Sequence, residues 1–110
     1  MSDMQEKLAN YKSKAIEQLE KAGEKDIDDA MLSELVNNLR LIVSKKDAAH
    51  VSGTDPVELE TVRKNFIVKK LGVDDKEKGQ AVCKDVAEKM SDSRLKNRAA
   101  FYYLCKKALS

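Results

Sequence analysis

Tryptophan is absent from this chain of 110 residues, and proline, glycine and aromatic residues are scarce. One Pro and four Gly leave few places for tight turns, which disfavours a sandwich or barrel of many short strands. The aromatic content of 5% means that the core must be mostly aliphatic. Because 42% of the residues are hydrophobic and 36% are charged, the composition is that of a folded chain, and we expect a single domain over residues 1–110.

The two cysteines, Cys83 and Cys105, are too few for a disulfide framework, and neither belongs to a CxxC pair. Both fall on apolar helical faces, where a free cysteine behaves as a small buried hydrophobic residue. Structural zinc needs closely spaced ligands, whereas the only histidine, His50, is far from both cysteines in the sequence. We therefore expect no metal and no cofactor.

Long apolar runs are also missing. The longest, Ala99–Cys105, is far short of the roughly 20 residues that a membrane-spanning helix requires. The first residues, Met1–Lys7, contain no apolar segment of the kind found in a signal peptide. We expect a cytoplasmic protein with reduced thiols and no membrane partner.

Apolar residues recur at steps of three and four along nearly the whole chain, which is the spacing of an α-helix. Tyr11, Ala15 and Leu19 fall on one helical face, and Gly23 follows at the position where a left-handed residue ends a helix. This rhythm predicts an all-α bundle of about five helices with a long loop at 44–54. The expected helices are 3–22, 28–43, 56–71, 75–90 and 93–108.

Acidic residues mark the expected helix starts, where a carboxylate can accept hydrogen bonds from free backbone N–H groups. Asp28 stands at the second helix, and Asp74 and Asp75 stand at the fourth. The third start is the clearest, since Asp55 can cap it, Pro56 needs no N–H there, and Glu58 can complete a capping box.

Three further features of the sequence bear on the later helices. Phe66–Val68 alone would fit a strand, but the cap upstream and Gly72 downstream favour a helix. Gly79 costs the fourth helix up to about 1 kcal/mol relative to alanine, unless close packing needs the missing side chain. Ala99–Cys105 is apolar nearly all round, which predicts the most buried helix of the set.

The net charge is only +2, from 21 basic and 19 acidic residues, but the charges are unevenly spread. Ser93–Ser110 carries five basic residues and no acid, whereas Glu24–Glu34 carries five acids and one lysine. One interpretation is that these two segments face each other inside the domain, or that the basic face is solvated. The lysine pairs Lys69-Lys70 and Lys106-Lys107 also suit the last turns of their helices.

The other interpretation of the basic segment is nucleic-acid binding. Arg94 and Arg98 share a helical face with Tyr102, and arginines beside a tyrosine can contact phosphates and stack on a base. The near-balanced total charge makes this the alternative rather than the favoured interpretation. The candidate nucleic-acid-binding residues are Arg94, Lys96, Arg98, Lys106 and Lys107.

A catalytic role is the third interpretation, and it depends on His50 in the 44–54 loop. A nucleophilic mechanism needs a thiol or hydroxyl beside the base, and no motif in the sequence places one next to His50. We therefore name no catalytic residue.

Two blocks, DPVELETVRKNFIVKKLGV (55–73) and NRAAFYYLCKK (97–107), resemble a family of small bacterial helical proteins catalogued only as a domain of unknown function. The resemblance implies a compact, helical, cytoplasmic bacterial protein. It brings no activity, cofactor or catalytic residue.

The sequence therefore predicts a non-enzymatic binding or self-association module, for which a homo-oligomer is one expectation. The alternative is a nucleic-acid-associated protein that uses the basic segment, and an enzyme that involves His50 comes third.

Overall fold

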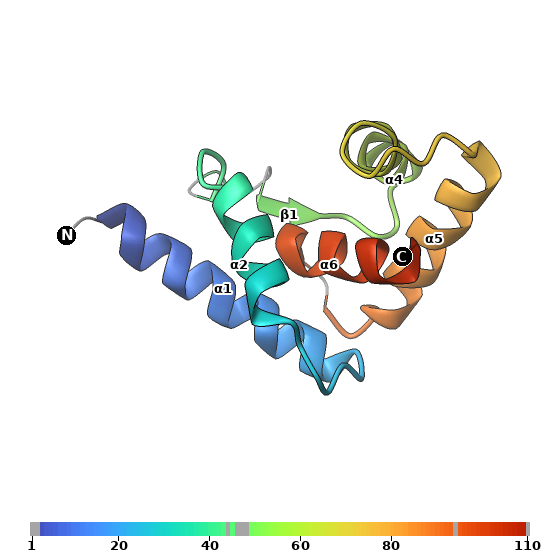
Figure 1. The fold of residues 1–110 in the computed structure, drawn as a ribbon. Helices are drawn as coiled ribbons and strands as arrows, with labels where there is room; N and C mark the ends of the chain where they lie inside the picture. The colour runs from blue at the N-terminus through green and yellow to red at the C-terminus, as the bar shows by residue number, and fades with distance from the viewer. Residues whose placement is uncertain (1–2, 44, 46–48, 94, 110) are drawn as a thin grey trace.

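The computed structural model describes residues 3–43, 45, 49–93 and 95–109, and helices dominate this part of the chain (Figure 1). The all-α prediction is confirmed. No helix in the described part is both long enough and apolar enough to cross a membrane. In chain order the elements are α1 (Asp3–Lys21), α2 (Asp29–Asn38), β1 (His50–Val51), α4 (Pro56–Val62), the π-helix η1 (Arg63–Val68), α5 (Lys76–Lys89), β2 (Lys96–Asn97) and α6 (Arg98–Leu109).

Three helices begin at the predicted aspartates. The side chains of Asp28, Asp55 and Asp75 accept hydrogen bonds from backbone N–H groups in the first turns of α2, α4 and α5, at 3.1, 2.9 and 3.1 Å. Each satisfies one of the N–H groups that a helix start leaves without an internal partner.

Glycine ends two helical segments, as predicted. Gly23 and Gly72 have φ angles of +98° and +73°, a conformation that strains any residue with a Cβ atom. The chain then folds back on each helix, because the N–H of Glu24 donates to Leu19 O at 2.9 Å and that of Val73 donates to Ile67 O at 3.0 Å.

The predicted bounds of the second and third helices need correction. α2 ends at Asn38 rather than at 43, and the next residues form tighter turns in which Arg40 N–H donates to Asn37 O. The third helix is regular only to Val62 and continues as η1, so Phe66–Val68 is helical, but in a wide turn rather than an α-turn.

The fifth helix begins at residue 98, five residues later than predicted, because Lys96–Asn97 is extended. This strand, β2, pairs antiparallel with β1, with His50 opposite Asn97 and Val51 opposite Lys96. The expected 44–54 loop therefore contains a strand. Residues 44 and 46–48 of that loop lie outside the described part of the chain.

The apolar helix α6 forms the centre of the molecule. It contacts α1 and α2 on one side and α5 and η1 on the other (Figure 1). The prediction that Ala99–Cys105 is deeply buried is confirmed, except that Tyr102 is half-buried. Around this helix lies one cluster of buried apolar residues, which includes Tyr11, Leu19 and Leu32.

Asn97 joins α1 to the start of α6. Its Oδ1 accepts from the Ala100 N–H at 3.1 Å and so caps α6, while its Nδ2 donates to Tyr11 O at 3.0 Å. Its backbone N–H donates to Gln18 Oε1 at 2.7 Å. The side chain is 1% exposed, so no water replaces these partners if it is removed.

We expect Asn97→Ala to lower the free energy of unfolding by about 2–3 kcal/mol, because a helix cap and a buried hydrogen bond are lost together. Asn10→Ala is the matched control, since Asn10 is exposed on α1. It should change the stability by less than about 0.5 kcal/mol. Urea unfolding followed by circular dichroism measures both, and equal values for the two variants would contradict this role of Asn97.

Candidate functional site

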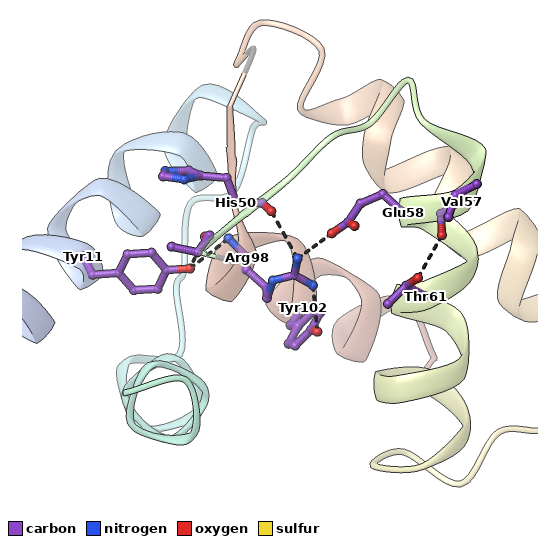
Figure 2. Close-up of polar contacts among 8 residues, drawn as sticks. Tyr11, His50, Val57, Glu58, Thr61, Arg98 and Tyr102 are labelled. Atoms are coloured by element: carbon purple, nitrogen blue, oxygen red, sulfur yellow. Dashed lines mark hydrogen bonds and ion pairs between the residues drawn. The ribbon is translucent and has the colours of Figure 1, made fainter. Parts of the chain in front are cut away.

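Arg98, one of the candidate nucleic-acid-binding residues, lies inside the domain rather than on its surface (Figure 2). Its Nη2 donates to the Glu58 carboxylate and, at 3.1 Å, to the carbonyl oxygen of His50. Its Nη1 donates to Tyr102 Oη at 3.1 Å, and the guanidinium carbon lies 5.7 Å from the centre of the Tyr102 ring. With 8% of the residue exposed, this charge is neutralised within the chain.

Tyr11 supports the same region from α1. Its hydroxyl donates to Ala49 O at 2.5 Å. The same hydroxyl accepts from the backbone N–H of Arg98 at 3.1 Å, and Figure 2 shows this second bond. Burial raises the pKa of Tyr11 from 10.0 to about 12. The phenol is therefore a structural link and is held in its neutral form.

The capping box predicted for Glu58 is wrong. Its carboxylate is turned to Arg98, and the N–H of Asp55 donates instead to Ser52 O at 3.3 Å. A buried guanidinium competes better for the carboxylate than a backbone N–H near solvent, because an unpaired buried charge is far more costly.

Lys96 and Lys107 also have partners within the chain. The Lys96 stem lies over Gly53, where a Cβ atom would come within 2.7 Å of Lys96 Cε, and its Nζ donates to Ser93 O at 2.8 Å. Burial lowers the pKa of Lys96. Lys107 Nζ lies 2.5 Å from Glu24 Oε2.

These contacts support the expected contact between the basic and acidic segments. The Lys107–Glu24 pair joins the two segments directly, and Tyr103 Oη in the basic segment accepts from the Asp28 N–H at 2.8 Å. Arg94 lies outside the described residues, and Lys106 is half-buried. Nucleic-acid binding by this set stays a prediction.

His50 contributes its backbone to the site through the carbonyl oxygen that Arg98 contacts. Its imidazole points away from the guanidinium and from Glu58 (Figure 2). Among residues 3–43, 45, 49–93 and 95–109, no three His, Cys, Asp or Glu side chains are grouped so that they could bind a metal ion.

A pocket with a volume of about 420 Å³ lies between α2, η1 and α6. Its apolar wall includes the stacked rings of Phe66 and Tyr102, whose centroids are 4.0 Å apart and whose planes differ by 10°. The lining residues are Glu34, Leu35, Asn38, Leu39, Asn65, Phe66, Lys70, Leu71, Tyr102 and Lys106. We call this the aromatic pocket.

Polar side chains at the aromatic pocket differ from those in the interior. Glu34, Asn38, Asn65, Lys70 and Lys106 form no side-chain hydrogen bond or ion pair with any residue that the structure describes. In the same described part, every buried side-chain N or O atom has a partner. The pocket therefore presents two ammonium groups, two amides and one carboxylate to whatever enters it.

Sequence reasoning identified only part of this pocket. The sequence places Lys70 and Lys106 in the last turns of their helices and Tyr102 on the helical face of Arg94 and Arg98. Asn38 and Asn65 were missed because single polar residues on exposed helix faces give no local signal. Only the tertiary contact of α2, η1 and α6 brings them together.

The fold and this pocket define a small all-α domain with an open site of mixed aromatic and charged character. A family model described as Protein of unknown function (DUF2853) matches residues 3–110, and the chain belongs to this family. The family resemblance inferred from the two sequence blocks is thereby confirmed. No curated protein matches the chain.

We expect Glu58→Gln to lower the free energy of unfolding by about 1–3 kcal/mol, because it leaves the buried Arg98 charge without its counter-ion. The control is Glu20→Gln, which changes an exposed glutamate on α1 and should shift stability by less than about 0.5 kcal/mol. Equal unfolding midpoints for both variants in urea would rule out a structural role for the ion pair.

The raised pKa of Tyr11 predicts a loss of stability in alkali. Since the folded state favours the neutral phenol, its contribution is complete below pH 10 and disappears as the pH rises from 10.0 to about 12. Tyr11→Phe should make the decline of unfolding free energy in this range shallower by up to about 1.4 kcal/mol per pH unit. Tyr103→Phe is the control: it retains the Tyr11 hydroxyl, so the part of the decline that Tyr11 causes should remain. Urea unfolding at a series of pH values measures the free energy of unfolding. If this free energy falls with pH as steeply in Tyr11→Phe as in the unaltered chain, the prediction is contradicted.

Proposed function

We propose that this protein is a binding module and that its ligand is a small organic anion with an apolar body, bound in the aromatic pocket. The observation that carries the proposal is the set of polar side chains lining the pocket that have no partner in the described part of the chain. Four of the five are exposed and Lys106 is half-buried, so water can solvate them in the free chain; their convergence beside an aromatic wall in one pocket is what favours an external partner.

The charges favour an anionic group on the ligand. Lys70 and Lys106 supply two ammonium groups against the single carboxylate of Glu34. A carboxylate or phosphate can accept hydrogen bonds from both lysines, and such charge-assisted bonds are stronger than neutral ones. Glu34 can accept from a hydroxyl or amino group elsewhere on the same ligand.

The remaining lining residues favour an apolar body. Leu35, Leu39 and Leu71 join the stacked rings of Phe66 and Tyr102 to form a continuous apolar wall. Asn38 and Asn65 can each donate and accept a hydrogen bond and so fix the orientation of the ligand. The volume of about 420 Å³ falls within the range of small-molecule sites.

The π-helix supports this location independently of the charges. Asn65 and Phe66 both belong to η1, and π-turns occur preferentially at functional sites. Association with a second copy of the chain and binding of nucleic acid are the competing outcomes. Each of these outcomes would also fit a cytoplasmic binding protein. The two free cysteines support a cytoplasmic location, because thiols stay reduced there.

The test is a titration of the isotopically labelled chain with pairs of small compounds, such as octanoate against octanamide and phenyl phosphate against phenol. We expect the anions to shift the side-chain amide resonances of Asn38 and Asn65, and the neutral partners to bind at least about tenfold more weakly. Lys70→Gln and Lys106→Gln should each weaken anion binding by about tenfold or more.

Lys69→Gln is the matched control, because Lys69 is exposed and does not line the pocket. It should retain the affinity of the unaltered chain. Equal binding of the anion and its neutral partner, or equal losses in all three lysine variants, would contradict the proposal. Resonance broadening that grows with protein concentration alone would favour self-association instead, and binding only to mixed RNA or DNA at low salt would favour nucleic acid.

A further inference from the structure

The two cysteines, separate in the sequence, are neighbours in the fold. Cys83 lies on α5 and Cys105 on α6, and these helices pack directly against each other. The two thiols lie close enough to interact, because the neighbouring Cys105 thiol is the largest cause of a lowered pKa at Cys83. Both thiols are free and buried, so they form a dithiol pair within the core.

The two thiols differ in their access to solvent. Cys83 lines a second pocket, of about 350 Å³, together with Pro56, Leu59, Glu60 and Gln80. Cys105 is fully buried, and the neighbouring Cys83 together with burial raises its pKa. A reagent that enters the second pocket therefore meets Cys83 first.

Charged groups beside Cys83 favour its thiolate. The stem of Arg63 crosses α5 at Gly79, one turn before Cys83, where a Cβ atom would come within 2.8 Å of Arg63 Cγ. This contact supplies the close packing expected at Gly79. Burial raises the pKa of Cys83, and the Arg63 charge acts with Cys105 to lower it, while Glu60, which pairs with Arg63 at 2.7 Å, opposes Arg63 more weakly.

We propose that Cys83 and Cys105 form a reversible redox site in which Cys83 attacks a small disulfide that enters the second pocket. The Cys83 thiolate bonds to one sulfur of the reagent and expels the other as a thiolate. Cys105 then attacks the Cys83 sulfur, the second thiolate leaves, and it takes the Cys105 proton. The protein loses two hydrogens and gains one S–S bond, while the disulfide is reduced to two thiols.

The test uses hydroxyethyl disulfide, a neutral reagent, on the folded full chain, with the products separated by intact mass. We expect the unaltered chain to lose two hydrogens and to accumulate little adduct. Cys105→Ala should stop at a single mixed disulfide on Cys83. Cys83→Ala should react at least about a hundredfold more slowly, because the remaining thiol is sealed in the core, where burial alone still disfavours its thiolate.

The outcome that would overturn the proposal is reaction through global unfolding. In that case the rate of reaction with the disulfide rises with low concentrations of urea as steeply as the equilibrium constant of unfolding does. Both single-cysteine variants would then react at the same rate. Arg63→Gln gives a second measurement, because it retains both cysteines and should slow the first step by several-fold at neutral pH. Circular dichroism of each variant confirms that the folded chain is the species tested, and anion binding at the aromatic pocket is measured separately.

Discussion

A guanidinium buried in a domain of this size must be neutralised by the chain itself, and Arg98 determines how three parts of the molecule meet. Its partners come from α4, from the backbone of β1 and from α6. Removing such a charge from water costs several kcal/mol, so an arrangement that separates these elements leaves the charge unpaired. The helical core supplies most of the apolar burial, while this ion pair specifies where α4 and the β1 segment lie on it.

The same requirement for partners distinguishes the interior from the aromatic pocket. Asn97 and Tyr11 satisfy their polar groups across elements that are distant in sequence, and Lys96 donates to the nearby Ser93 carbonyl oxygen. At the aromatic pocket the polar side chains have no partner in the described part of the chain, although the apolar residues beside them are well packed. Among the described residues, the buried polar atoms are paired and maintain the fold, whereas the exposed groups around this pocket remain available for binding.

Local patterns in the sequence predicted the helices and their caps but not the long-range contacts. Aspartate caps and glycine stops act within one turn, so Asp55 and Gly72 could be assigned from neighbouring residues. The strand at Lys96–Asn97 exists only because β1 lies beside it, and the role of Glu58 depends on a residue forty positions away. The adjacency of Cys83 and Cys105 likewise depends on how α5 crosses α6. Such features arise from tertiary packing, which periodicity alone does not encode.

The wide turn of η1 has a consequence for the evolution of the aromatic pocket. A π-turn accommodates about one residue more than the α-turn it replaces. Deleting one residue between Arg63 and Val68 would convert the segment to regular α-helix and leave the flanking turns where they are. Lys70 would then stay at the aromatic pocket, whereas Asn65 and Phe66 would no longer hold their places in its wall. The length of this segment therefore serves as a structural marker of the pocket across related chains.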